Sequence, residues 1–578
     1  MKDCTNIHKT KKSSIIRTLK NNNTEISDDI DKANFINSYF TSIGENLSQK
    51  HSTPDDFDIL NHIYSISPTT YSTEISITQI AKDLEKVKAK KAPGPDGISS
   101  KVLSLIKSSA ADGLFTVFHK SSSLKKFPDI WKQAKITPVY KKGSFSDVSN
   151  YRPISLLSIP GKLLENQICS IIDSHLQACN LLSEHQWGFR KGHSTEDLLL
   201  TMTEKWKLAM DKGHIVGAIF IDFQKAFDTV SHEILSLKLN AVGISGPLHQ
   251  WLMNYLFDRY QFTEINNKRS ALLPIKFGVP QGSLLGPRLY TIYTNDLPNQ
   301  VKDGSSMMYA DDTTLYTIGS SIDQVISSLN AMMSQISKWS SLNKLTIHPL
   351  KTEAMILAKQ QFIGPLQPLY FGVGFVKLVN STSCLGVTID NKLSWHSQVD
   401  TVKASFSKKI GALRRMSYLP KSTLEEIYFK TIIPSITYGI SVWGNCSQSL
   451  LNSLDHIHAR ACRIINRLPS SQESSSCLLQ CNWLPISYLY KRRILLKMHQ
   501  IFTGAAPSQI LEMFSLSSRS QRFCNQFNII RVQSELGRSS LQYRGPNIWN
   551  FINKKAKPCT LEEKVFDNTT RTKKVVSS

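Results

Sequence analysis

Seven consecutive residues, Ile215 to Ile221, form the longest clear apolar run of the chain, and an acidic residue, Asp222, follows them at once. Only Gly217 interrupts their apolar or strand-forming character, so the run predicts a buried β-strand. A carboxylate at the end of a buried strand is costly unless a partner compensates its charge. A metal ion is one such partner, so this strand constrains both the fold and the chemistry.

A second acidic feature lies between two strand-forming segments, in residues 307–316. Asp311 and Asp312 interrupt the pattern there, which predicts a tight β-hairpin with both aspartates near its tip. Two adjacent carboxylates repel each other and therefore need a cation nearby. A plain surface turn is the alternative. The pairs Asp28-Asp29 and Asp55-Asp56 stand in polar surroundings, where a helix start and a loop explain them.

Asp222 and Asp311 together can build a two-metal site. Two divalent ions roughly 3.5–4 Å apart stabilise the attacking and leaving oxygens of an in-line phosphoryl transfer. Magnesium suits such a site because it takes oxygen ligands and retains several waters. The pattern therefore favours an enzyme of phosphoryl transfer, in which catalysis consists mainly of positioning and charge neutralisation.

Short sequence blocks follow one another between about residue 80 and residue 395, at 131–143, 150–156, 186–190, 220–228, 278–283, 309–312, 345–353 and 384–387. In their order and spacing they resemble the motifs of the reverse transcriptases of non-LTR retrotransposons, especially the jockey-like and neighbouring clades. On this resemblance, the first two blocks are fingers motifs, the third is the block before motif A, the next four are motifs A, B, C and D, and the last is the primer-grip region.

The resemblance implies an RNA-directed DNA polymerase, which adds dNTPs to a DNA primer on an RNA template. It implies Asp222, Asp311 and Asp312 as the catalytic residues, with the first two carrying most of the metal ligation. Phe223 joins these three in the predicted metal site. The implied cofactor is a pair of Mg²⁺ ions, with Mn²⁺ as a possible substitute.

Six further residues are implied to contact the nucleotide. A flat ring at the steric gate would clash with a ribose 2′-hydroxyl and so select deoxynucleotides. The motif B turn would bring an amide and a glycine close to the nucleotide. The fingers and motif D would supply basic groups for the triphosphate and the leaving pyrophosphate. The alternatives are core packing for the ring and plain solvent exposure for the basic residues. The six are Phe227, Gln281, Gly282, Lys142, Arg152 and Lys351.

Basic residues are concentrated in the last third of the chain, where 26 Lys and Arg stand against nine Asp and Glu from residue 401 onward. Such a surface suits nucleic acid, because each neutralised phosphate releases a counterion. Within a predicted thumb helix, two basic pairs fit contacts to the template–primer backbone, although a solvated helix face explains them equally well. The pairs are Lys408-Lys409 and Arg414-Arg415.

The predicted fold class is α+β: a right-hand polymerase with fingers, a palm with an antiparallel sheet and a helical thumb, followed by a basic helical extension. Residues 1–75 are predicted as an N-terminal extension with one amphipathic helix after an unstructured start at 1–28. Residues 76–395 are predicted as fingers and palm, 396–470 as a thumb-like region and 471–578 as the C-terminal extension.

Two other functions remain open at this point. One is a catalytically silent, polymerase-derived protein that binds nucleic acid, and the other is an intron-type reverse transcriptase with splicing activity. The sequence predicts an intracellular protein without a membrane partner, because no signal peptide or apolar span is visible. The resemblance implies assembly in the cytoplasm and action in the nucleus. The oligomeric state is left open.

Overall fold

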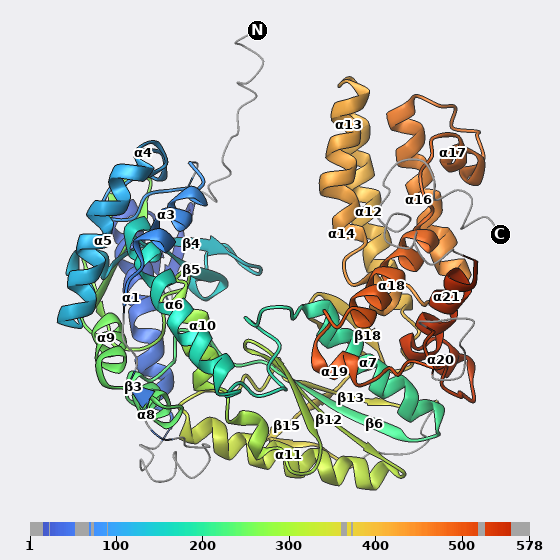
Figure 1. Cartoon of the computed structure of the whole chain (residues 1–578), viewed down its shortest axis with the longest axis horizontal. Coiled ribbons are helices and arrows are strands. Elements are labelled where there is room, and N and C mark those ends of the chain that lie inside the picture. The colour runs from blue at the N-terminus through green and yellow to red at the C-terminus, as the bar shows by residue number, and fades with distance from the viewer. Residues whose placement is uncertain are drawn as a thin grey trace. The chain divides into compact units, whose positions relative to one another are not determined.

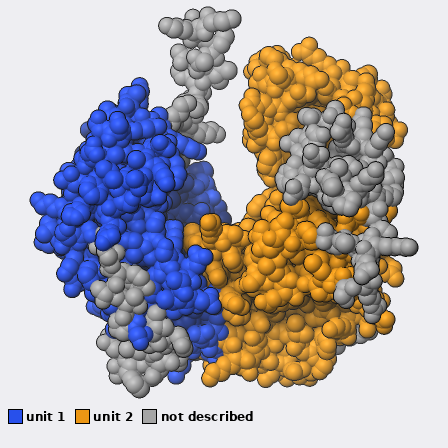
Figure 2. All heavy atoms as spheres, viewed as in Figure 1, with its two compact units in different colours: residues 1–183, 223–300, 335–348 blue, residues 184–222, 301–334, 349–578 orange. Residues whose placement is uncertain are grey.

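The computed structural model describes residues 16–21, 24–51, 67, 69–70, 74–89, 91–359, 367–371, 374–517 and 526–555. They form a mixed α/β protein that divides into two compact units (Figure 2). Unit 1 consists of residues 1–183, 223–300 and 335–348, and unit 2 consists of residues 184–222, 301–334 and 349–578. Both units are discontinuous in sequence, because the chain leaves unit 1 and returns to it twice.

A five-stranded sheet organises unit 1. Its strand order is β10-β8-β4-β5, and β9 also pairs with β8. Strand β4 runs antiparallel to β5 and parallel to β8. The strands are β4 (Gln133–Tyr140), β5 (Tyr151–Leu156), β8 (Arg259–Ile265), β9 (Lys268–Arg269) and β10 (Leu273–Ile275), and two-residue strands β3 (Thr69–Thr70) and β7 (Ile244–Ser245) pair separately.

Helices surround this sheet. The first, α1 (Asp29–Ser48), begins after Asp28, whose carboxylate accepts the backbone N–H groups of Ile30 and Asp31 at 2.8 and 3.0 Å. This confirms the predicted capped helix. The remaining helices are α3 (Ile77–Glu85), α4 (Ser100–Leu105), α5 (Lys107–Leu124), α6 (Ile159–Ala178), α8 (His232–Ala241), α9 (Gly246–Leu256) and α10 (Leu285–Tyr293).

The prediction of an unstructured start is wrong for residues 19–21 and 24–26. Strand β1 (Leu19–Asn21) pairs antiparallel with β2 (Thr24–Ile26). Two scattered apolar side chains, Ile16 and Leu19, anchor this segment in a buried cluster with residues of α1 and β4. Residues 1–15 and 22–23 of the predicted segment lie outside the described residues.

The sheet of unit 2 has the strand order β11-β12-β6-β13-β16, with β6 in the centre. Strand β6 covers Ile215–Ile221, as predicted, and runs antiparallel to both of its neighbours. The predicted hairpin is confirmed as β11 (Ser305–Tyr309) and β12 (Asp312–Gly319). The other strands are β13 (Glu353–Leu357) and β16 (Lys377–Leu378), and separate pairs are β14 (Tyr370–Phe371) with β15 (Gly374–Phe375) and β17 (Ser381–Cys384) with β18 (Val387–Asp390).

The glycine within β6 has a packing role. A Cβ atom on Gly217 would lie 2.4 Å from Cγ1 of Val325, at the start of helix α11 (Ile322–Leu342). Only a residue without a side chain lets this helix approach the strand so closely. The strand that carries Asp222 is therefore held between two paired strands and a closely packed helix.

The rest of unit 2 is helical, as predicted for the chain beyond residue 400. Helix α12 packs against α16, and α18 packs against both α16 and α21 (Figure 1). The helices are α7 (Thr195–Asp211), α12 (His396–Arg415), α13 (Lys421–Ile427), α14 (Ile433–Ile436), α15 (Ile440–Trp443), α16 (Gln448–Asn466), α17 (Ser474–Gln480), α18 (Ile486–Phe502), α19 (Ser508–Leu511), α20 (Glu535–Arg538) and α21 (Leu541–Lys555).

Helix α7 joins the sheet of unit 2 to the C-terminal helices. Its first turn carries two buried carboxylates, Glu196 and Asp197. Glu196 forms an ion pair with Arg493 of α18, and Asp197 accepts a hydrogen bond from Nζ of Lys497 at 2.5 Å. The side chains of Asp197 and Lys497 are only 6% and 7% exposed, so each charge depends on the other.

The remaining length of α7 makes similar contacts. Buried Glu204 accepts the backbone N–H of Leu541, at the start of α21, at 2.6 Å. Asp211 accepts the backbone N–H of Gln533 at 2.8 Å and the hydroxyl of Ser534 at 2.5 Å. The C-terminal helices are therefore part of the same packed unit as the sheet.

No helix among the described residues is both long and apolar enough to cross a lipid bilayer.

We predict that Lys497→Ala destabilises the protein by roughly 3–5 kcal/mol, because it leaves the carboxylate of Asp197 buried without its counter-charge. Urea denaturation followed by circular dichroism measures this change. The matched control is Arg538→Ala, which removes an ion pair with Glu535 whose side chains are 57% and 85% exposed. That control should cost less than about 1 kcal/mol. Equal effects of both substitutions would contradict the anchoring role of Lys497.

Candidate active site

The three predicted catalytic carboxylates lie at one end of the sheet of unit 2. The last paired residues of β6 and β12 are Ile221 and Thr313. Asp222 directly follows Ile221 and Asp312 directly precedes Thr313, so both aspartates lie at the same end of this strand pair. Asp311 belongs to the two-residue turn between Tyr309 and Asp312, which pair with each other. Segments far apart in sequence thus bring the three aspartates together.

Backbone contacts on the hairpin explain why this turn is tight. Ala310 adopts a positive φ of 60°, and its N–H donates to Oε1 of buried Gln186 at 3.1 Å. The same oxygen accepts the N–H of Gly188 at 2.8 Å. A Cβ atom on Gly188 would lie 2.4 Å from the nitrogen of Ala310, so this position requires glycine. The block at 186–190 therefore supports the turn that carries Asp311.

Lys351 lies next to the first carboxylate. Its Nζ is 3.4 Å from Oδ2 of Asp222, and the two side chains are 50% and 41% exposed. The backbone N–H of Asp222 donates to Oγ1 of Thr352 at 3.4 Å. The motif D segment thus brings a cation to the carboxylate that motif A supplies. An ion pair this exposed is weak and can exchange partners.

The donor set at this end of the sheet fits a magnesium ion, since it consists of carboxylate oxygens that remain accessible. As the side chains stand, however, no three His, Cys, Asp or Glu residues in the described part of the chain are grouped so that they could hold a metal. Phe223, the fourth predicted member, is 5% exposed and forms an isolated bridge with Ile347 within unit 1. The metal ligands therefore stay a prediction.

The remaining predicted nucleotide contacts lie in unit 1. The ring of Phe227 stacks on Tyr290, with 4.4 Å between the centroids and 24° between the planes. Lys142 is exposed in the connection between β4 and β5. Arg152 is an exposed residue of β5, paired with Val139. Both positions are consistent with the predicted contacts of Lys142 and Arg152 to the triphosphate. They are equally consistent with basic side chains that simply face solvent.

Motif B forms a tight turn that is fixed by backbone hydrogen bonds. The N–H of Val279 donates to the carbonyl of Phe227 at 2.8 Å, and the N–H of Ser155 donates to the carbonyl of Gln281 at 2.9 Å. Gly282 has a φ of 121°, and a Cβ there would lie 2.8 Å from the oxygen of Ser155. Gly282 is thus required for the close approach of the turn to β5.

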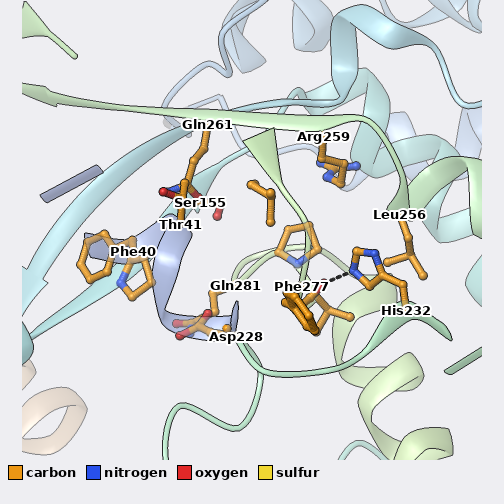
Figure 3. Close-up of a pocket in the computed structure, with 16 residues that line it drawn as sticks. Phe40, Thr41, Ser155, Asp228, His232, Leu256, Arg259, Gln261, Phe277 and Gln281 are labelled. Atoms are coloured by element: carbon orange, nitrogen blue, oxygen red, sulfur yellow. Dashed lines mark hydrogen bonds between the residues drawn. The ribbon is translucent and has the colours of Figure 1, made fainter. Parts of the chain in front are cut away.

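The side chain of Gln281 has a partner that the sequence analysis did not identify. Its Nε2 donates to both carboxylate oxygens of Asp228, at 2.8 and 3.0 Å. Both residues lie on the wall of a pocket in unit 1, together with His232, whose ring bonds to the carbonyl of Gly278 at 2.8 Å (Figure 3). Asp228 is the last residue of motif A. Its place in that motif is the sequence feature that could have marked it as a functional residue.

The predicted thumb contacts lie on α12. Lys408, Arg414 and Arg415 are exposed on this helix. Lys409 is half-buried and donates to the hydroxyl of Ser435, so it is held within unit 2 by a contact that its sequence pattern did not indicate. The primer-grip region forms the turn between β17 and β18.

Residues 139–389 match the family model described as reverse transcriptase (RNA-dependent DNA polymerase). This part of the chain is a reverse transcriptase domain. It contains both the aspartate hairpin of unit 2 and the motif B turn of unit 1, and the resemblance to non-LTR elements is confirmed by the relatives.

Two relatives from Drosophila melanogaster show the similarity to the polymerases of mobile elements. The chain is 28% identical over 407 residues to the probable RNA-directed DNA polymerase from transposon BS. This alignment covers 68% of this chain and 45% of the relative. It is 28% identical over 411 residues to the RNA-directed DNA polymerase from mobile element jockey, covering 68% and 44%. The chain thus spans about half the length of these relatives.

Among solved structures, apo telomerase from Candida tropicalis, truncated from its C-terminal domain, aligns with a TM-score of 0.32 and 13% identity. The alignment covers 45% of this chain and 53% of that chain, a likeness too small to define the fold.

In the reverse transcriptase domain, we predict that Gly278→Ala destabilises the protein by about 2 kcal/mol or more. Its φ is 84°, and a Cβ would lie 2.8 Å from the Cα of Asp228, so backbone strain and a clash add together. The matched control is Gly97→Ala, at a φ of 70° with open space around the added Cβ. It should cost only about 1 kcal/mol. Thermal unfolding of both variants measures the difference, and a Gly278 variant no worse than the control would contradict the clash.

A second prediction concerns the pH dependence of stability. Burial raises the pKa of Asp228 from 3.8 to about 6, although the bond from Gln281 and the charge of Lys225 oppose the shift. Because the folded-state pKa is the higher one, the stability contributed by this group is full below pH 4 and is lost as the pH rises through 6. Asp228→Asn removes this loss, so the variant should gain on the order of 1–3 kcal/mol relative to wild type between pH 4 and pH 7.

Urea denaturation at pH 4.5, 6 and 7.5 tests this expectation. The control is Asp112→Asn, which alters an exposed carboxyl on α5 of the same unit. The difference in unfolding free energy between this control and wild type should be the same at all three pH values. A difference for Asp228→Asn that is also independent of pH would show that this carboxyl titrates as if it were solvated.

Proposed function

We propose that the chain is an RNA-directed DNA polymerase of a non-LTR retrotransposon, with a right-hand arrangement of fingers, palm and thumb. Its reaction adds a dNTP to the 3′-hydroxyl of a DNA primer on an RNA template and releases pyrophosphate. The observation that supports the proposal is the pairing of β6 with β12, which leaves Asp222 and Asp312 at the same end of the two strands, with Asp311 in the adjoining turn and all three inside the matched residues.

In this proposal, Asp222, Asp311 and Asp312 hold two Mg²⁺ ions, for which Mn²⁺ can substitute. When bound, such ions activate the primer hydroxyl and neutralise the charge of the triphosphate. The three side chains are suited to this role because they are carboxylates at the solvent-accessible end of a rigid sheet. Lys351 is a further cation beside Asp222, where it can bind the triphosphate or give a proton to the leaving pyrophosphate.

The residues of unit 1 select and position the nucleotide in this proposal. The ring of Phe227 is held in place by its stacking on Tyr290, which makes it a stiff barrier to a ribose 2′-hydroxyl. Arg152 and Lys142 are exposed and available to the triphosphate. The backbone of Gln281 is fixed by its hydrogen bond with Ser155. The motif B turn therefore loses little conformational entropy when it binds the nucleotide.

The exposed basic residues of α12 support binding of the template–primer duplex. Lys408, Arg414 and Arg415 would neutralise phosphates without reading the base sequence. Such contacts make affinity fall as the salt concentration rises. The three side chains belong to the same packed unit as the aspartate hairpin.

We predict that Asp311→Ala lowers primer extension on an RNA template by roughly a thousandfold or more, because a carboxylate that stabilises transition-state charge is lost. The assay uses the purified full chain with a primed RNA, dNTPs and Mg²⁺. The control is Asp323→Ala, which removes an exposed carboxylate at the start of α11 in the same unit and should leave extension unchanged.

Other results would point to the alternatives. Tight RNA binding without extension by either the wild-type or the Asp311→Ala chain would indicate a silent nucleic-acid-binding protein. Splicing of a bound intron RNA by the wild-type chain would indicate an intron-type protein. Undiminished extension by Asp311→Ala would refute the role of the hairpin.

A further inference from the structure

The motif B turn of unit 1 is held by contacts of two kinds. Its backbone is fixed at both ends, because the N–H of Gly278 donates to the carbonyl of Val230 at 2.8 Å and the carbonyl of Gln281 accepts the N–H of Ser155 at 2.9 Å. These bonds leave the side chain of Gln281 free to rotate. The contact that restrains this side chain is the pair of hydrogen bonds to Asp228.

The chemistry of this pair determines which end of the amide faces the carboxylate. An ionised carboxylate has no proton to donate and accepts hydrogen bonds only. The amide NH₂ of Gln281 must therefore point toward Asp228, and its Oε1 must point away. A glutamine without this partner could turn its amide by 180° and present the opposite pattern of donor and acceptor.

Asp228 is in turn held rigidly. Its backbone N–H donates to the carbonyl of Lys225 at 2.8 Å. A Cβ atom on Gly44 of α1 would lie 2.6 Å from its carbonyl oxygen, and one on Gly278 would lie 2.8 Å from its Cα, so glycines on two elements let the chain close around it. Figure 3 shows Asp228 and Gln281 directed toward each other at the pocket wall.

We propose that Asp228 is a positioning residue for nucleotide selection: it fixes the amide of Gln281 with Oε1 directed away from the carboxylate. The inference rests on the proposed function, because it gives Gln281 a nucleotide to contact. Asp228 itself does not touch the nucleotide in this proposal. Its effect on dNTP binding passes through Gln281 and disappears when that side chain is removed.

A double-mutant cycle on the full chain tests the inference. The variants are Asp228→Ala, Gln281→Ala and the two combined, and the readouts are KM for dNTP and kcat in primer extension on RNA. Each single substitution should raise KM roughly tenfold, because a hydrogen bond to a charged group is lost or the contact itself is removed. The double variant should have the KM of Gln281→Ala alone. A double variant with the product of both single effects would overturn the proposal.

Two further variants separate positioning from folding. Asp228→Asn keeps the shape of the side chain and one acceptor oxygen, so its KM should lie between those of wild type and Asp228→Ala. Thr41→Val changes another wall of the same pocket, where the hydroxyl bonds to the backbone of its own helix, and should leave KM unchanged. If Asp228→Asn matches wild type while Asp228→Ala loses kcat and thermal stability together, the role is structural and the proposal is overturned.

The same measurements distinguish a failure of this inference from a failure of the proposed function. If the wild-type chain extends primers and the effects of the two substitutions on KM multiply, this inference is overturned. The proposed polymerase activity is unaffected by that result. Wild-type chain that extends no primer on RNA overturns the proposed function and this inference with it.

Discussion

The central position of β6 in the sheet of unit 2 is the constraint on which the rest of the candidate site depends. The strand pairs antiparallel on both sides, with β12 and β13, so its register cannot slip without breaking two ladders and reversing the side-chain faces of a buried strand. Gly217 lets α11 close over it. The backbone pairing over the whole length of β6 therefore fixes where the strand ends, and Asp222 follows that end directly.

Features with a short-range pattern could be predicted from the sequence. The apolar run 215–221 is a strand with the predicted bounds, and the aspartate pair at 311–312 lies at a hairpin tip because strand-forming residues flank it on both sides. The helix after Asp28 begins at a predicted capping residue. In each case the signal and its structural result lie within about ten residues, so the local sequence pattern is enough to predict the element.

Features with long-range partners could not be predicted in this way. The acidic residues of α7 read as an ordinary polar helix face, and their partners Arg493 and Lys497 lie about 300 residues further on. Lys409 reads as a free cation but bonds to Ser435. Leu19 gave no sign of its burial, because one apolar residue in a polar segment has no periodicity. Composition indicates that a charge exists, and only the fold determines whether that charge is available to a ligand.

Asp228 shows how such a hidden partner relates to function. A carboxyl whose pKa burial raises to about 6 is a cost to the folded protein at neutral pH, and an asparagine of the same shape would avoid this cost. A protein retains a destabilising group where a site needs the chemistry of that group. Favourable interactions elsewhere in the fold then offset the lost stability. In unit 1, the backbone bonds of the motif B turn and the close packing at Gly44 and Gly278 hold the chain around Asp228. A rigid surrounding is thus what allows an ionisable acceptor to be kept beside Gln281, where a neutral residue would leave the direction of the amide undetermined.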